Sequence, residues 1–325
     1  MKYVPLKGVS SIGYATTNNL LQDSLIEYFD YALLDKGNYF NVTKGETAFN
    51  GSDYSRLRLS SHDQYASGQV WEGFRSNWVW QSGINPSGHE PPIVGDNIAF
   101  QGISGVYVDD EFHPTSGVGP FSHHVDYFNG RVIFDSSIDT SSVVQAEFSY
   151  KYINVVYANS VPWLREVQTR TRYPTSDFLD TSKGKWDIPP EARLQLPAIA
   201  IEIAPQRKFK GYQLGGGQWI YTDIIFHCIA EDEYTRNQLI DIVSLQNDKT
   251  LYLLNLNQMS DADDYPLDYR GVPVSGAKTY PELIEQYGTN KVRVINTVVE
   301  EMIMLKADVF GGIVKTTAEL IKTNI

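Results

Sequence analysis

The sequence predicts an α+β protein in which a mixed sheet flanked by helices carries an inserted antiparallel β domain. Three features predict this: a helical stripe near the N-terminus, a central region of short β-prone runs, and a β–turn–β–α–β order after Leu194. With 42% apolar and 20% charged residues, the composition is typical of a folded protein. The 25 glycines and 15 prolines favour a β-rich chain with many turns.

A helix is predicted over residues 19–36, where apolar side chains recur three and four positions apart. The residues of this stripe are Leu20, Leu21, Leu25, Ile26, Phe29, Ala32 and Leu33. Asn18 or Asn19 can cap the start of the helix, and Gly37 is a suitable stop. Because no neighbouring segment covers the apolar face, we expect the helix to pack on a distant part of the chain.

The region that follows the helix alternates short β-prone runs with turn residues. Asn129-Gly130 is a strong signal for a two-residue hairpin turn. In the strand after it, the alternation of Val132 and Phe134 with their neighbours predicts one face more buried than the other. We expect a small antiparallel β domain over about residues 93–158, preceded by irregular strands.

From Leu194 onward the pattern predicts a sheet with a helix packed on it. The stretch LPAIAIEIA alternates as a half-buried strand, GYQLGGG is a turn, and WIYTDIIFHCIAE is a long apolar strand. A helix of two to three turns follows Asp232, and it carries Leu239, Ile240 and Val243. TLYLLNLN predicts another strand, and residues 290–310 predict one or two long closing strands.

The chain therefore divides into four predicted parts. They are an N-terminal helix with the first strands of the core (1–60), an inserted β-rich domain (61–160), a proline-rich connecting segment (161–193) and an α/β core with C-terminal strands (194–325). We expect the acidic loop with Asp261, Asp263 and Asp264 to be solvated.

Charge and cysteine content exclude several classes of protein. Lys and Arg total 27 against 39 Asp and Glu, a net charge of −12, which excludes a strongly basic nucleic-acid-binding protein. The single cysteine, Cys228, cannot form an intramolecular disulfide. The first residues lack the apolar core of a signal peptide, and no apolar run approaches a membrane span. We therefore expect a soluble protein without membrane association, assembled in the cytoplasm.

The histidines do not predict a metal site. His123 and His124 could be combined with His113 and the nearby Asp109 and Asp110. However, adjacent residues on a strand point to opposite faces of a sheet, so His123 and His124 should not share one ion. We predict no bound metal, and a solvated boundary between loop and strand.

Other patterns that can carry chemistry are incomplete. His227-Cys228 lies near Asp223 in an apolar strand, where a free cysteine behaves as a small buried hydrophobe. The glycines at 215–217 lack the Gly-Lys-Ser/Thr ending of a phosphate-binding loop. We therefore predict no catalytic residues, no cofactor and no enzymatic activity, although a hydrolase using scattered carboxylates stays a third alternative.

The most unusual local composition is an aromatic cluster in VWEGFRSNWVWQSGI. Its members are Trp71, Phe74, Trp78 and Trp80, and on a strand Trp78 and Trp80 would lie on one face. Core packing, a protein interface and a sugar-binding platform all fit such a cluster. With Asp109 and Asp110, these four residues are our candidates for contact with a partner.

Five stretches carry a resemblance to a known family. Four of them are NLLQDSLIEYFDYALLDKGNYFNVT, VWEGFRSNWVW, ISGVYVDDEFHP and VDYFNGRVIFDSSI. The fifth and most telling is LPAIAIEIAPQRKFKGYQLGGGQWIYTDIIFHCIAEDEYTRNQLIDIVSLQNDKTLYLLNLN. Together they resemble the tail terminator and neck proteins of contractile-tailed bacteriophages. The resemblance covers about two thirds of the chain as a pattern without an invariant signature. The inserted β domain and long C-terminal part exceed a minimal terminator, so neck connector and sheath-completion roles stay open.

The resemblance implies a tail-terminator-like core and a structural virion protein at the head–tail junction. It would form a homohexameric ring that caps the tail tube, contacts neighbouring neck, tube or sheath proteins, and lets DNA pass without sequence recognition. An acidic composition is compatible with such a conduit, because it repels phosphates. The alternative from another class is a carbohydrate-binding or adhesion module that uses the Trp/Tyr-rich β domain.

Two parts of the chain are expected to divide this work. The block 194–256 with the N-terminal helix should form the oligomerisation core, and the β domain should contact partners. Three successive glycines between apolar strands are entropically costly, so we expect close approach to a neighbouring subunit or a positive φ there. The interface candidates are Leu214, Gly215, Gly216, Gly217 and Trp219.

Overall fold

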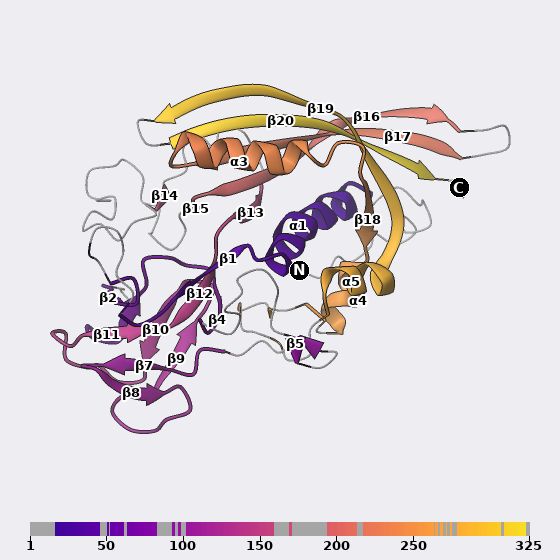
Figure 1. The fold of residues 1–325 in the computed structure, drawn as a ribbon. Coiled ribbons are helices and arrows are strands. Elements are labelled where there is room, and N and C mark those ends of the chain that lie inside the picture. Colours follow the sequence, from indigo (N-terminus) through magenta and orange to yellow (C-terminus); the bar gives the residue numbers. More distant parts are fainter. Residues whose placement is uncertain are drawn as a thin grey trace.

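The protein is mostly β, with one curled mixed sheet of six strands and several small antiparallel sheets (Figure 1). It is described by a computed structural model. The described residues are 17–45, 51, 53–61, 64–82, 93–94, 97–98, 102–158, 169–170, 194–212, 217–262, 264–265, 267–268, 271, 274, 278–306 and 309–322. The predicted connecting segment lies almost wholly outside them.

The six-stranded sheet has the order β13-β16-β17-β20-β19-β18. Its strands are β13 (Asn154–Tyr157), β16 (Ala198–Gly211), β17 (Gln218–Ala230), β18 (Thr250–Leu254), β19 (Gly288–Lys306) and β20 (Val309–Lys322). Only β13 and β16 run parallel, and every other neighbouring pair is antiparallel. The predicted mixed sheet and the hairpin around GYQLGGG are confirmed, whereas our sequence interpretation stopped at Phe310 and missed most of β20.

Two helices cover one face of this sheet, α1 (Thr17–Asp35) and α3 (Glu233–Ser244), and both lie beneath its arch in Figure 1. Leu25 and Phe29 of α1 and Leu239 of α3 join one apolar core with Phe226 and other strand residues. The distant partner expected for the N-terminal helix is therefore the six-stranded sheet. Burial of large apolar side chains contributes roughly 1.5–3 kcal/mol each to such packing.

The ends of the helices follow from local chemistry. At the end of α1, Gly37 takes a φ of +96°, and Asn38 N–H donates to the Leu33 carbonyl at 2.9 Å, so the glycine stop is confirmed. The predicted caps Asn18 and Asn19 are wrong, because α1 already begins at Thr17. α3 is capped by Asp232, whose carboxylate accepts from Thr235 N–H at 2.7 Å.

Gly312 allows α3 to approach the sheet closely. A Cβ atom at this position of β20 would lie 2.5 Å from the Cδ1 atom of Ile240 on α3. A side chain there would require the Ile240 side chain to shift, so glycine allows Ile240 to pack directly on this strand.

The small sheets lie together, at the lower left in Figure 1. Their orders are β1-β12-β4, β2-β3-β10-β9 and β11-β7-β8. The strands are β1 (Tyr39–Val42), β2 (Arg58–Leu59), β3 (Val70–Glu72), β4 (Trp78–Trp80), β7 (Gly105–Val108), β8 (Glu111–Pro114), β9 (His123–Asp126), β10 (Arg131–Phe134), β11 (Val144–Ala146) and β12 (Phe148–Lys151). Two further pairs are formed by β5 (Ile93–Val94) with β6 (Asn97–Ile98) and β14 (Thr169–Arg170) with β15 (Leu194–Gln195).

This pairing changes where the inserted part begins and ends. The strands β1 and β2, which we assigned to the core, pair with β12 and β3 of the small sheets. At the other end, β13 belongs to the six-stranded sheet, although we placed it within the β domain. The small-sheet region is therefore the stretch 39–151.

The chain enters and leaves this region at adjacent residues. The Tyr152 N–H donates to the Asn38 carbonyl at 3.3 Å. The Asn38 side chain also accepts from Ile153 N–H at 2.9 Å and donates to the Ile153 carbonyl at 3.2 Å. One asparagine thus joins the two ends of the insertion.

Arg75 holds the small sheets against the core. Its side chain is completely buried, and the guanidinium donates to the carbonyls of Leu196 and Tyr152. Asn77 and Asn154 also share a hydrogen bond across this joint. These bonds connect the loop before β4 to β13 and to the residues that precede β13 and β16.

The hairpin at Asn129-Gly130 differs from its prediction. Arg131 pairs with Asp126, so the loop has four residues, and only Gly130 within it has a positive φ, of +64°. Strand β10 is buried at all four positions instead of on one face. It is flanked by β3 and β9, and its Arg131 is paired with Asp126 at 2.8 Å.

Two more predictions about the core are corrected. The strand β16 is not half-buried throughout, because Ala198 and Ala200 are as buried as the isoleucines between and after them. Asp264 is not solvated, because it is paired with Lys278 and accepts from the Tyr287 hydroxyl, whereas Asp263 of the same loop lies outside the described residues. The helices that build this corner, α4 (Leu256–Asp261) and α5 (Tyr280–Tyr287), were not predicted.

Candidate functional site

The four aromatic candidates for partner contact are buried. Trp71, Phe74, Trp78 and Trp80 are each no more than 6% exposed. Trp78 stacks on Phe148 with the ring centroids 4.0 Å apart, and its indole N–H donates to the Arg75 carbonyl at 2.8 Å. Core packing, one of the three readings of this cluster, is therefore what the structure shows.

Trp78 and Trp80 also lie on opposite faces, contrary to our expectation. Trp80 is opposite Ser149 and Trp78 is opposite Tyr150, so a bulge in β4 places three residues against two. Trp78 accordingly packs with Phe148, whereas Trp80 packs with Tyr39 in a separate cluster. One extra residue in the strand separates the two indoles.

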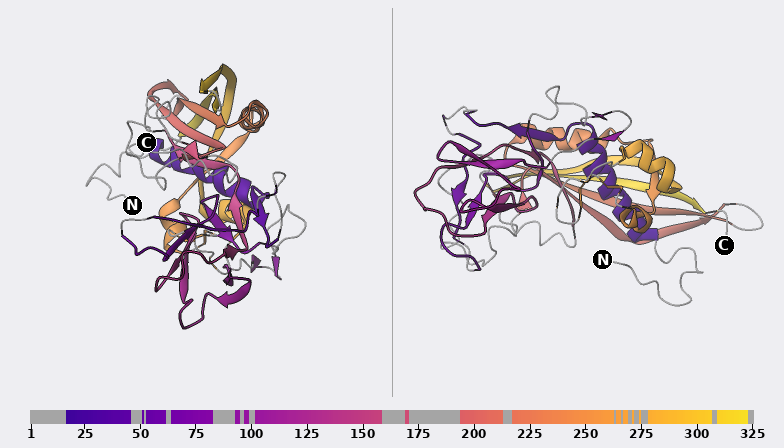
Figure 2. Two further views of the ribbon diagram at one scale, coloured as in Figure 1. Left: turned by 90° about the vertical axis from the view of Figure 1, so that its left-hand side faces the viewer. Right: turned by 90° about the horizontal axis from the view of Figure 1, so that it is seen from below.

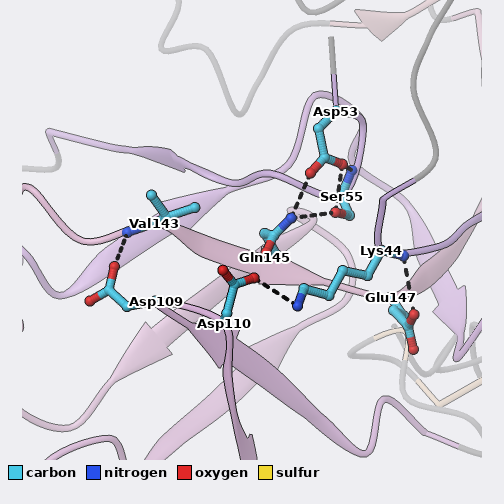
Figure 3. Close-up of polar contacts among 8 residues, drawn as sticks. All are labelled: Lys44, Asp53, Ser55, Asp109, Asp110, Val143, Gln145 and Glu147. Carbon is cyan, nitrogen blue, oxygen red and sulfur yellow. Dashed lines mark hydrogen bonds and ion pairs between the residues drawn. The ribbon is translucent and has the colours of Figure 1, made fainter. Parts of the chain in front are cut away.

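Asp109 and Asp110 form the tight turn between β7 and β8, with φ of +50° and +71° (Figure 3). Aspartate tolerates this left-handed conformation better than most residues. Asp109 accepts from the Val143 N–H at 2.8 Å, which fixes the turn to β11. Asp110 forms an ion pair with Lys44 at 2.8 Å, and its side chain is 85% exposed. Of the six candidates for partner contact, Asp110 is thus the one that is most available.

The same corner contains further polar contacts, drawn in Figure 3. Gln145 donates to both Asp53 and Ser55, and the Lys44 N–H donates to Glu147 at 3.1 Å. A shallow pocket of about 180 Å³ lies nearby. Its lining residues are Gln81, Ser104, Gly105, Tyr107, Phe112 and Glu147. Two polar residues of the pocket, Glu147 and Gln81, already accept from the backbone N–H groups of Lys44 and Ser104. Their side chains therefore connect neighbouring segments of the small sheets.

The residues considered for metal binding and nucleophilic chemistry do not converge. His123 is buried and His124 is exposed, which confirms that they diverge. The expected solvated boundary is therefore wrong for His123. No group of metal-ligating side chains occurs in the described part of the chain. Cys228 is buried in the apolar core, and burial raises the pKa of its thiol to about 12. His227 lies on the opposite face and contacts Glu202 at 3.2 Å.

The glycine-rich turn is only partly described. Leu214, Gly215 and Gly216 lie outside the described residues, so their predicted role stays a prediction. Gly217 has a φ of +90°, as we expected of this turn. Trp219 is half-buried and lies beside Tyr212 and Tyr221.

Sequence reasoning missed the edges of the six-stranded sheet. β13 pairs only with residues 198–201 of β16, and β18 pairs only with residues 288–293 of β19. No described strand covers the outer side of residues 202–211, here named the β16 edge, or of residues 298–306, the β19 edge. Within the described part of the chain, the outward backbone groups of these segments are not paired with a strand, and another strand can bind to such an edge.

The two edges carry exposed apolar side chains. On the β16 edge Phe209 is exposed, and on the β19 edge the exposed residues are Val298, Val299, Met302 and Met304. The register across the sheet places the β16 edge at the end where β18 covers β19, and the β19 edge at the end where β13 covers β16. The edges therefore lie at diagonally opposite corners of the sheet, as Figure 1 shows and as the right-hand view of Figure 2 also lets the reader follow.

Comparisons with known proteins found no match, either to a protein family or to a curated protein. Within the described residues, none of the helices combines the length and apolarity needed to cross a membrane. The functional conclusion therefore depends on the residues and on the sheet geometry described above.

Proposed function

We propose that the protein is a structural subunit of a phage virion, a tail terminator or neck protein that forms a ring at the head–tail junction. The observation that carries this proposal is the pair of half-open edges at opposite corners of the six-stranded sheet. A natural monomer protects the edges of its sheets, and an exposed apolar edge marks a site of association.

The position of the edges favours a ring over a two-fold dimer. Two different edges on one subunit support head-to-tail contacts, which repeat from copy to copy and close into a ring when the rotation allows. The resemblance of the sequence to tail terminator and neck proteins supports a homohexamer with a tail-terminator-like core. The net charge of −12 supports passage of DNA through the ring without sequence recognition.

In this proposal the small sheets contact the neighbouring neck, tube or sheath proteins. They form a compact body beside the six-stranded sheet and carry exposed turns such as the one with Asp110. Loops held by a rigid sheet are suited to specific contacts. No observation favours the carbohydrate-binding alternative, because the tryptophans on which it depended are buried.

Native mass spectrometry and negative-stain microscopy of the purified protein test the proposal. We expect the mass of a closed oligomer, six copies by the resemblance, and particles with an open centre. Full-length protein that stays monomeric across a range of concentrations, and also in the presence of isolated tail tubes, would contradict it.

A further inference from the structure

We propose that neighbouring copies join by strand addition, in which the β16 edge of one copy pairs with the β19 edge of the next. This inference rests on the proposed self-assembly and specifies the contact that produces it. The part of the β16 edge concerned is 207–211, beyond Pro205 and the register shift between Ile203 and Arg207. Proline has no N–H to donate, so strand addition should begin after it.

The strand directions permit this pairing. β16 is antiparallel to β17, β17 to β20, and β20 to β19. β19 therefore runs opposite to β16, and placing β16 of a second copy beside β19 of the first continues the sheet in antiparallel order. Because the two edges lie at opposite corners, the second copy is displaced along the strands relative to the first.

On the helix-covered face, the two edges are complementary in apolar character. Phe209 is opposite Ile220, a core residue, so its side chain lies on the face that α1 and α3 cover. Val299 and Met302 share this face, because they are opposite Val314 and Gly312 of β20. All three side chains are more than 40% exposed in the single chain. A phenyl ring against valine and methionine is a favourable contact, since thioethers pack well on aromatic rings.

On the other face the edges are complementary in charge. Lys208 and Lys210 are exposed and lie opposite Tyr221 and Trp219, on the face away from the helices. Glu300 lies on the β19 edge on that same face, near Lys315. The distance from Glu300 to Lys315 is 3.9 Å, and Lys315 is closer to Asp223, at 3.4 Å. Among the described residues, the ion pair of the Glu300 carboxylate with Lys315 is therefore a weak one.

The same charges oppose symmetric pairing. Two β16 edges side by side would bring the lysines of both copies together, and two β19 edges would bring the glutamates together. Like charges directly opposite each other destabilise a strand pair. Pairing of unlike edges is therefore favoured, and it produces the head-to-tail contact that a ring requires.

Cysteine cross-linking between single variants of the full-length protein distinguishes these arrangements. We expect Phe209→Cys and Met302→Cys to form a disulfide-linked dimer when the two variants are mixed and oxidised, and neither variant to cross-link alone. The native Cys228 should not interfere, because it is completely buried. As a matched control, Val118→Cys, exposed on the small sheets, should not cross-link with Met302→Cys.

Charge exchange provides a second measurement that does not depend on the cysteines. Lys208→Glu should weaken association at least tenfold, and adding Glu300→Lys in the same chain should restore most of it. A closed oligomer that shows no mixed cross-link, or that cross-links within one variant alone, would overturn the strand-addition contact while leaving the proposed ring intact. A wild-type protein that never oligomerises would overturn both.

Discussion

The six-stranded sheet and the small sheets are held together by different interactions. In the large sheet, β16, β17, β19 and β20 are 13 to 19 residues long, and one continuous apolar face packs against two helices. In the small sheets, strands have only two to four residues. Aromatic stacking and polar side chains that bond to distant backbone groups supply the register there.

This difference explains what each region can do. Long strands with an apolar face form a scaffold whose edges remain partly open for association. Short strands joined by side-chain bonds form a closed body that presents turns. Changes at single residues should therefore damage the small sheets more than the large sheet, and four predictions test this in decreasing order of effect.

The largest effect is expected for Trp78→Ala. The side chain is 1% exposed and stacks on Phe148, so its removal should lower the free energy of unfolding by about 3–5 kcal/mol. Chemical denaturation with hydrogen exchange should show the loss in the small sheets. Trp219→Ala, at a half-buried position of the large sheet, serves as the control and should cost about 1 kcal/mol. Equal losses for both variants would contradict the comparison.

Arg75→Met should weaken the joint between the two regions. Methionine keeps much of the volume but leaves the carbonyls of Leu196 and Tyr152 without their donor, at a cost of about 2–3 kcal/mol. Denaturation curves measure this, and Arg293→Met, which removes only an exposed ion pair with Asp248, should change stability by less than about 1 kcal/mol. If Arg75→Met leaves stability unchanged, the guanidinium does not hold the joint.

Glu27→Gln should change the pH dependence of stability. Burial, with a contribution from Asp30, raises the pKa of Glu27 to about 8, so the folded state holds a proton that the unfolded state releases near pH 4.5. Stability is then highest below the unfolded pKa and falls as the pH rises from about 4.5 to 8.

The glutamine variant cannot lose this proton. It should match the wild type at pH 4 and become progressively more stable than the wild type as the pH rises from about 4.5 to 8. Urea denaturation at several pH values measures the difference, with Glu285→Gln as the exposed control. Parallel pH profiles for wild type and Glu27→Gln would show that the pKa of Glu27 is the same in the folded and unfolded states.

The smallest effect is expected at the start of α3, in the large-sheet region. Asp232→Ala removes the acceptor of the Thr235 N–H and should cost about 1 kcal/mol, with faster exchange in the first turn. Asp232→Asn keeps a side-chain acceptor, so its loss of stability should be only a fraction of the loss for Asp232→Ala. A loss above that of Arg75→Met would reverse the ranking of the two regions.

Long, regular segments could be predicted from the sequence. The stripe of α1, the two strands around GYQLGGG and the helix after Asp232 each follow from a repeated pattern, and all are present. The small sheets were predicted less well, because single residues determine the register and facing of their short strands. A bulge in β4 turns Trp78 and Trp80 to opposite faces, and four residues instead of two close the hairpin at Gly130.

The candidate site was less predictable than the fold. Whether a strand is an edge depends on the lengths of its neighbours, and the short reach of β13 and β18 cannot be read from the sequence of β16 or β19. The turn aspartates were identified as candidates, but the partners of Asp109 and Asp110 lie 34 and 66 positions away along the chain. Their separate roles therefore became clear only in three dimensions.

The bonds between Asn38 and residues 152–153 hold the two ends of the small-sheet region next to each other on the large sheet. Because the insertion departs and returns at one place, its length does not set the distance between the ends at which it joins the large sheet. The same position would accept a fluorescent domain whose two termini lie close together. Such a fusion would label the large sheet for imaging.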